Sequence, residues 1–183
     1  LPAGITEIGD GTFRDCSGLT AMTIPASVTS IGENAYKNCT SLEKVALPKG
    51  ATVIDDGAFY GCTALTDLTI PGSLITLGTD AFYGCAIQKL TFAEGSVLKS
   101  IGAYAFATYD RYDASYYFTE ITIPAEYMGK PVKAIGKGAF ANCSALTSIT
   151  IPESVTSIGA GAFDGCTGLI QQEGGVSYVA KWA

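Results

Sequence analysis

Cysteine recurs along this chain at a fixed interval, and that interval restricts the possible folds more than any other feature. The six cysteines occupy one position of a 23-residue unit: Cys16, Cys39, Cys62, Cys85, Cys143 and Cys166. An aromatic residue precedes each cysteine by three positions, and Phe106 continues the series: Phe13, Tyr36, Phe59, Phe82, Phe140 and Phe163. A short period of this kind is typical of repeat architectures, in which each unit contacts only its neighbours.

The clearest unit runs from Leu146 to Cys166 and predicts two short extended segments and one tight turn. Leu146, Ile149 and Ile151 have the spacing of a strand with one buried face, and Pro152 ends that strand because it has no amide hydrogen. A second extended segment passes through 155–158, and a tight helical turn follows through 162–166. We therefore expect a strand, a second extended segment and a turn in every repeat.

One such unit cannot fold alone. Backbone order costs about 1–2 kcal/mol per residue, whereas each large apolar side chain returns only about 1.5–3 kcal/mol on burial. Stacking must supply the difference, so equivalent strands of successive units should pair in parallel. The prediction is a leucine-rich-repeat-type solenoid of about 23 residues per repeat, with a curved parallel sheet on its concave face. The alternative is a right-handed parallel β-helix, which requires strand-like alternation through 35–39.

The repeat also resembles a known family. The run Cys-x-x-Leu-x-x-Ile-x-Ile-Pro-x-x-Val-x-x-Ile-Gly-x-x-Ala-Phe at 143–163 is similar to the BspA-type bacterial leucine-rich repeat, and 129–136 resembles a variant of it. Seven copies account for residues 1–170, and 171–183 is predicted to be a strand-like segment that begins a cap or further chain. The resemblance implies an extracellular or cell-surface module for adhesion or protein interaction, and it implies no catalytic residue.

Composition excludes several function classes. Of the 183 residues, only 11 are Lys or Arg and the net charge is −6, which disfavours a nucleic-acid surface. No apolar run approaches the roughly 20 residues of a membrane helix, so this segment should not insert into a membrane. The chain contains no His, which removes His-based catalysis and His-ligated metal sites. We expect no enzyme activity, no cofactor and no metal site.

The cysteines are predicted to be buried free thiols rather than disulfides. They occupy one repeat slot, so their side chains point the same way on coils about 4.8 Å apart, whereas a disulfide draws the Cβ atoms to about 3.8 Å. Two pairs of carboxylates are close enough in sequence to be glycosidase candidates, Asp55-Asp56 and Asp110 with Asp113. Asp55 replaces the turn glycine of its repeat, and Asp110 and Asp113 lie in a polar segment that favours solvation, so neither pair predicts catalysis.

Outward strand positions form two columns on the predicted sheet. Threonine dominates one column, and the other alternates in charge through Lys44, Asp67, Lys89 and Glu120. Such a surface is either a solvated sheet, whose lateral charge pairs each add about 0.2–1 kcal/mol, or a polar face suited to glycans or proteins.

Departures from the period mark the candidate binding site. About six extra residues lie between Tyr109 and Phe118, about five between Pro124 and Val132, and two precede Leu98. Insertions in solenoids form loops on one face and often bind partners, and the first insertion is rich in tyrosine, which favours binding contacts. The tyrosines serve either the core or a ligand. The predicted contact set is Asp110, Arg111, Tyr112, Asp113, Tyr116, Tyr117, Lys89, Thr91, Glu120 and Thr122. The partner would be a host or matrix protein or a glycan; the alternative role is a passive spacer.

Overall fold

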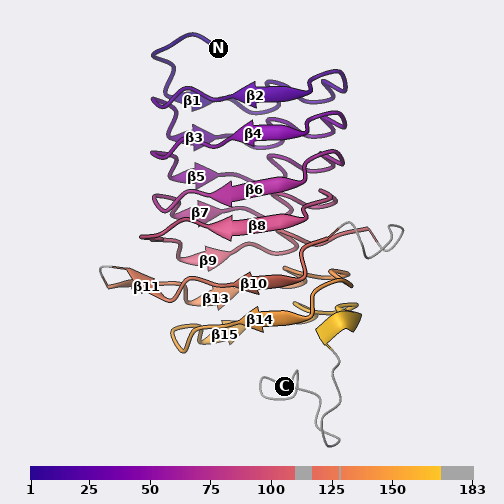
Figure 1. Cartoon of the computed structure of the whole chain (residues 1–183). Helices are drawn as coiled ribbons and strands as arrows, with labels where there is room; N and C mark the ends of the chain where they lie inside the picture. The colour runs from indigo at the N-terminus through magenta and orange to yellow at the C-terminus, as the bar shows by residue number, and fades with distance from the viewer. Residues whose placement is uncertain (110–116, 128, 170–183) are drawn as a thin grey trace, which may run out of the picture.

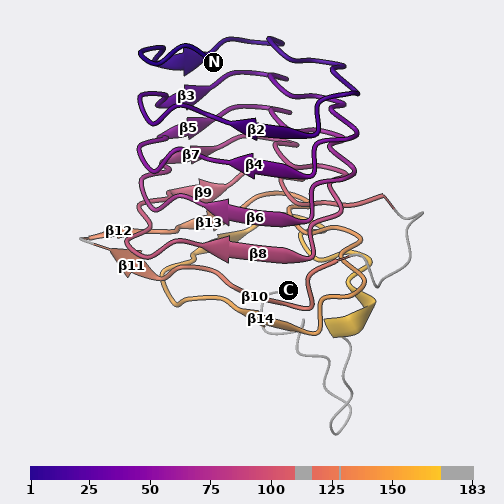
Figure 2. The same ribbon diagram turned by 45° about the horizontal axis from the view of Figure 1, so that its top comes forward.

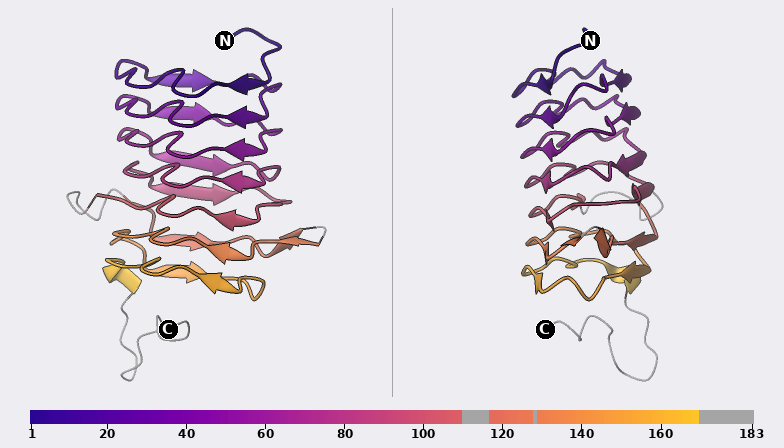
Figure 3. Two further views of the ribbon diagram at one scale, coloured as in Figure 1. Left: turned by 180° about the vertical axis from the view of Figure 1, so that it is seen from behind. Right: turned by 90° about the vertical axis from the view of Figure 1, so that its left-hand side faces the viewer.

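The structure is a computed structural model that describes residues 1–109, 117–127 and 129–169. The chain winds as a solenoid whose successive coils stack along one axis (Figure 1). Each coil contributes two short strands that cross it in opposite directions, so the strands form two separate ladders, which Figure 3 shows as two columns of arrows. The family of folds that the sequence predicts, a parallel-strand repeat solenoid, is therefore the one observed.

The second extended segment of each repeat builds a continuous ladder. Its seven parallel strands pair in the order β1-β3-β5-β7-β9-β13-β15. Isoleucine lies opposite isoleucine in this register, as in Ile8 with Ile31 and Ile135 with Ile158. The strands are Glu7–Ile8 (β1), Ser30–Ile31 (β3), Val53–Ile54 (β5), Thr76–Leu77 (β7), Ser100–Ile101 (β9), Ala134–Ile135 (β13) and Ser157–Ile158 (β15).

The first strand of each repeat pairs only in twos. The parallel pairs are β2-β4, β6-β8 and β10-β14, and an antiparallel hairpin, β11-β12, projects beyond the coils after β10 (Figures 1 and 2). We expected one uninterrupted ladder here, so the breaks are a difference from the prediction. The strands are Ala21–Thr23 (β2), Lys44–Ala46 (β4), Asp67–Ile70 (β6), Lys89–Phe92 (β8), Glu120–Thr122 (β10), Glu126–Tyr127 (β11), Lys130–Pro131 (β12) and Ser148–Thr150 (β14).

The predicted helical turn is a chain of tight turns. Amides bond the carbonyl three residues back, as in Cys39 N to Tyr36 O at 3.2 Å, but a left-handed residue interrupts each turn before a helix develops. Asn38 has a φ of 59° and its equivalent Gly61 a φ of 71°. Among the described residues the only helical element is the short 3₁₀ segment η2, Thr167–Leu169. Because 34–38 are turns rather than a third strand, the β-helix alternative is wrong.

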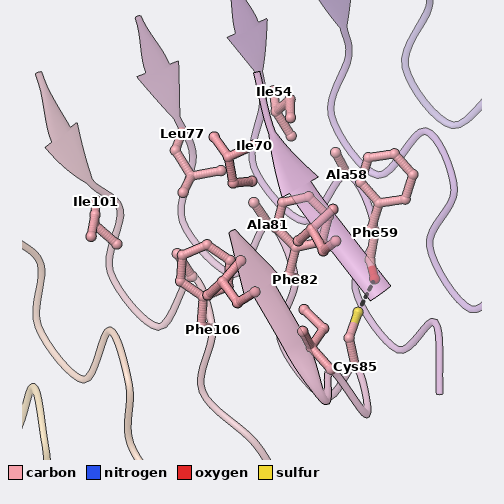
Figure 4. Packing of buried hydrophobic residues seen from close by; sticks show 14 of the residues in the cluster. Ile54, Ala58, Phe59, Ile70, Leu77, Ala81, Phe82, Cys85, Ile101 and Phe106 are labelled. Atoms are coloured by element: carbon pink, nitrogen blue, oxygen red, sulfur yellow. Dashed lines mark hydrogen bonds between the residues drawn. The ribbon is translucent and has the colours of Figure 1, made fainter. Parts of the chain in front are cut away.

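A column of aromatic rings fills the centre of the solenoid. Phe59 and Phe82 are buried and stack with their ring centroids 5.0 Å apart, close to the spacing of paired strands (Figure 4). The column continues through Phe106 to Phe140 at 5.6 Å and to Phe163 at 5.6 Å. Each repeat thus places its ring on that of its neighbour and contributes to one continuous core.

The cysteines are free thiols, and all except Cys16 are buried. Each buried thiol donates to a backbone carbonyl 26 or more residues earlier in the sequence. Cys62 Sγ lies 3.1 Å from Tyr36 O, and Cys85 Sγ lies 3.2 Å from Phe59 O (Figure 4). The prediction of buried thiols rather than disulfides is therefore confirmed for five of the six cysteines, and Cys16 is exposed.

Candidate functional site

The candidate site lies where the first ladder is broken between β8 and β10. These two strands are consecutive first strands, yet no ladder joins them, and each is the outer strand of a different two-stranded sheet. Sequence insertions lie on both sides of β10, and the hairpin β11-β12 extends from its far end (Figure 1). The break therefore coincides with the departures from the repeat period.

The strands separate because the loops that follow them lean in opposite directions. After β8, Val97 N bonds Gly72 O of the preceding coil at 2.9 Å, and a Cβ on Gly72 would collide with the Glu94 carbonyl oxygen. After β10, Ile123 N bonds Thr150 O of the following coil at 2.9 Å. The starts of the strands stay close, since Phe118 N bonds Ile87 O at 2.9 Å. The gap is thus a wedge that opens toward the strand ends.

This wedge encloses a hollow of about 460 Å³, called the β8–β10 hollow below. Residues 90–96 form one wall, and 120–122 with 124 and 125 form the other. Buried Ile121 and half-buried Phe92 supply apolar surface; the Phe92 ring meets Phe106 edge to face at 6.4 Å, which ties the wall to the central column. The lining combines a small apolar surface with polar groups above it, as binding sites commonly do.

Among the described residues that line the hollow, the charged groups are carboxylates. Glu94 and Glu120 come from opposite walls and both are exposed, and this described lining contains no Lys or Arg. Thr91 and Thr122 add exposed hydroxyls, and buried Ser96 accepts the amide of Leu98 at 3.4 Å. The hollow is therefore an anionic, hydrogen-bonding surface.

The structure brings together three of the predicted contact residues. Thr91, Glu120 and Thr122 line the β8–β10 hollow and are exposed. Lys89 is also exposed but lies at the start of β8, outside the lining. The predictions for Asp110, Arg111, Tyr112, Asp113 and Tyr116 fall outside the described residues and stay predictions from sequence.

Tyr117 differs from the expectation for a contact residue. Only 4% of it is exposed, and it directly precedes Phe118, which is 3% exposed and meets Phe140 edge to face at 6.4 Å. Both side chains are thus withdrawn from solvent where the insertion rejoins the coil. Tyr117 therefore has the core role, one of the two roles that the sequence allows for these tyrosines, and it is not a contact residue.

The alternating charges form fewer lateral pairs than their sequence pattern suggests. Asp67 and Lys89 lie opposite each other on paired strands, in register between β6 and β8. Lys44 lies on β4 and its predicted partner Asp67 on β6, but these two strands are not paired. Glu120 on β10 is separated from Lys89 on β8 in the same way. Within 1–109, 117–127 and 129–169 the ion pair found is Arg14 with Asp15 at 3.4 Å. These columns remain exposed and polar.

The carboxylate pair Asp55-Asp56 hydrogen-bonds to backbone amides in the turns, whereas Asp110 and Asp113 lie outside the described residues. Asp56 Oδ1 accepts the amide of Thr79 in the next coil at 2.6 Å, and Asp55 Oδ1 accepts the amide of Asp56 at 2.9 Å. Asp10 has the same role toward Glu33 N at 2.9 Å. Among the same turns, burial raises the pKa of Asp80, and the negative charge of Asp56 raises it further. These groups serve the stacking of coils. The described residues hold no group of three or more metal-ligating side chains.

Several lining residues were not singled out from the sequence. Glu94, Ser96, Pro124 and Ala125 belong to the walls of the β8–β10 hollow. A larger hollow of about 770 Å³ adjoins it along β4 and β6 and shares Ala93, Glu94 and Gly95. Two sequence signals lie here: two residues are inserted before Leu98, and Ala93 stands where other repeats have proline. Neither signal predicted that the loop after β8 contacts the preceding coil.

The fold and the site together define a repeat scaffold with a surface hollow. More specifically, the chain belongs to the BspA-type leucine-rich repeat family: the model described as BspA type Leucine rich repeat region matches in six copies, over 1–113 and 111–173. Among curated proteins no sequence matches the chain. No helix among the described residues is long and apolar enough to span a bilayer.

The chain is also similar to solved structures of bacterial leucine-rich repeat proteins. The leucine-rich repeat protein of T. pallidum is 30% identical, with a TM-score of 0.77, over 92% of this chain and 75% of that one. A leucine-rich repeat protein of Eubacterium ventriosum shows the fold, at 22% identity and a TM-score of 0.61, over 87% of this chain and 46% of that one. The pneumococcal vaccine antigen PcpA is 20% identical, with a TM-score of 0.46, over 82% of this chain and 57% of that one.

Proposed function

We propose that this chain is a noncatalytic binding scaffold, and that its contact surface is centred on the β8–β10 hollow. One observation carries the proposal: the hollow coincides with the insertions around β10 and exposes Thr91, Glu120 and Thr122 together. Solenoids bind through surfaces built along their stacked repeats, and insertions mark their binding faces. The partner class is a host or matrix protein or a glycan.

Two features support a noncatalytic role. The family consists of repeat scaffolds, whose functions depend on sites placed on a shared fold. The tight carboxylate pair at 55 and 56 hydrogen-bonds to backbone amides in a turn, away from the hollow lining. A glycosidase needs two carboxyls across a cleft, with one of them withdrawn from water. Glu94 and Glu120 lie on opposite walls of the hollow, but both are exposed, so neither has the buried environment of a general acid.

We place this scaffold outside the cell, at the bacterial surface or secreted. Membership of the BspA-type family supports this location. The exposed threonine column and the low content of Lys and Arg suit an extracellular protein or glycan partner better than nucleic acid.

A panel of matrix proteins and glycans tests the proposal. The wild-type chain should be retained by a member of the panel, and Thr122→Arg should lower retention at least tenfold by filling the hollow, a loss of about 1.4 kcal/mol. Thr23→Arg is the matched control, because Thr23 is exposed at the same repeat position on β2, outside the hollow.

Each alternative has a distinct outcome on this panel. A passive spacer would be retained by no component. Equal losses for Thr122→Arg and Thr23→Arg would contradict a contact surface at the hollow. Turnover of a polysaccharide on the same panel, abolished by substitution of Asp110 or Asp113, would show an enzyme instead.

A further inference from the structure

We propose that the β8–β10 hollow binds a short extended peptide segment that carries lysine or arginine. This inference deepens the proposed function by naming the chemistry of the partner, and it rests on that function. Two independent features of the hollow support it: unpaired strand edges and charge of one sign.

The first feature is the backbone of the two walls. In a parallel strand, the amide and the carbonyl of one residue both point to one neighbouring strand, and those of the next residue point to the strand on the other side. In β8, Lys89 N bonds Thr66 O at 3.0 Å, and Ala93 N, just beyond the strand, bonds Ile70 O at 2.9 Å. Both bonds run toward the β6 coil. The backbone groups of Leu90 and Phe92 therefore face the hollow, where none of the described strands pairs with them.

The same alternation applies to β10. Thr119 O accepts Thr147 N at 2.8 Å and Ile123 N bonds Thr150 O at 2.9 Å, so odd-numbered residues face β14. Glu120 and Thr122 consequently direct their backbone groups toward β8. Exposed strand edges of this kind recruit extended peptides, whose main-chain hydrogen bonds give affinity while side-chain contacts give specificity.

The second feature selects the side chains of the peptide. Glu94 and Glu120 are the charged residues of the lining, and they come from opposite walls. A cationic side chain that lies between them meets two carboxylates, whereas an acidic one meets repulsion. The chain as a whole carries a net charge of −6, which also favours a basic partner. Alternate apolar side chains of the same peptide would reach Ile121 and Phe92.

Titration calorimetry with three synthetic octapeptides tests this inference. The first alternates lysine and valine, the second replaces lysine by glutamate, and the third keeps the lysines but is N-methylated at alternate residues, which removes its amide donors along one edge. We expect the first peptide to bind and the other two to bind at least tenfold more weakly. Raised salt should weaken the first interaction.

Matched variants assign the binding to the hollow. The double variant Glu94→Gln/Glu120→Gln should weaken binding of the lysine peptide about tenfold, as expected for two lost charge pairs. The control Asp67→Asn/Glu153→Gln removes the same charge from the same two repeat positions outside this hollow, and should bind as wild type. All four positions are exposed, so the thermal midpoints should stay equal.

Specific outcomes overturn the inference. Equal binding of the glutamate peptide, equal binding of the N-methylated peptide, equal losses in the two double variants, or no binding of the lysine peptide would each contradict it. Retention on the glycan panel that Thr122→Arg abolishes, without binding of the lysine peptide, would reject the peptide and leave the proposed function standing. No retention and no peptide binding would reject both.

Discussion

At the scale of single residues, Tyr36 differs from the rest of the aromatic column in which it lies. Its ring stacks between Phe13 at 5.0 Å and Phe59 at 4.9 Å, with no exposed surface. Its hydroxyl is buried and has no hydrogen-bond partner within the described part of the chain. Burial of an unsatisfied hydroxyl costs about 1–3 kcal/mol. The Tyr36 hydroxyl is therefore a destabilising polar group in an otherwise apolar stack.

Removal of that atom should stabilise the chain. Tyr36→Phe is expected to raise the free energy of unfolding by about 1 kcal/mol, because the ring contacts persist while the desolvation cost of the hydroxyl disappears. Urea denaturation of the variant and the wild type measures the difference. Tyr60→Phe is the control, since Tyr60 is only half-buried and should change little. A less stable Tyr36→Phe variant would show that the hydroxyl has a favourable partner.

Because its thiols are buried, the chain should lose stability as the pH rises into the alkaline range. Burial raises the pKa of Cys166 from its ordinary 9.0 to about 11, although the backbone bond from Cys143 partly opposes this. Burial also raises the pKa of Cys143. The unfolded chain therefore releases these protons first. The contribution to stability is complete below pH 9 and is lost as the pH rises toward 11.

Unfolding free energies at several alkaline pH values check this sign. We expect stability to be level with respect to these thiols below pH 9 and to fall between pH 9 and 11. The fall should be shallower in Cys166→Ala, which lacks one of the titrating groups. A wild-type curve that rises over this range would contradict the burial of the thiols.

At the scale of elements, the aromatic column holds neighbouring coils together. Phe59 is fully buried and stacks on Tyr36 and Phe82, whereas Tyr60 lies half-buried on the outside, between the Lys37 ammonium and the Tyr83 ring. The two residues are adjacent in sequence and both are aromatic. Their burial alone should separate their contributions to stability.

Alanine at each position measures that separation. Phe59→Ala should cost about 3–5 kcal/mol, because it leaves a cavity between two stacked rings. Tyr60→Ala should cost about 1–2 kcal/mol, since solvent already reaches the ring. Chemical denaturation of both variants provides the comparison. Equal costs would mean that the column does not carry the stacking energy.

The sequence predicts the repeating elements well and the breaks between them poorly. The regular spacing of Phe59, Cys62 and their equivalents predicted one continuous core, because equivalent residues of neighbouring coils contact each other in a stacked repeat fold. The separation of β8 from β10 depends instead on which coil each loop contacts, here Gly72 and Thr150. Those contacts are set by tertiary packing, so insertion lengths located the candidate site but did not reveal the hollow or Glu94.

At the scale of the whole molecule, the two ladders differ in continuity. The second ladder runs through seven strands and carries the stack past the insertions, since β9 pairs directly with β13. The first ladder can therefore open between β8 and β10 without division of the core. A continuous wall opposite an interrupted one lets a rigid scaffold present a recessed surface, which is the physical basis of the proposed function.

Hydrogen–deuterium exchange is the most direct test of that account. The chain is measured alone and with the panel member that retains it most strongly. We predict slower exchange for Lys89–Phe92 and Glu120–Thr122 in the complex, and unchanged exchange for Ala21–Thr23, the first strand farthest from the hollow in sequence. Slower exchange confined to other strands, with both walls of the hollow unaffected, would contradict the account.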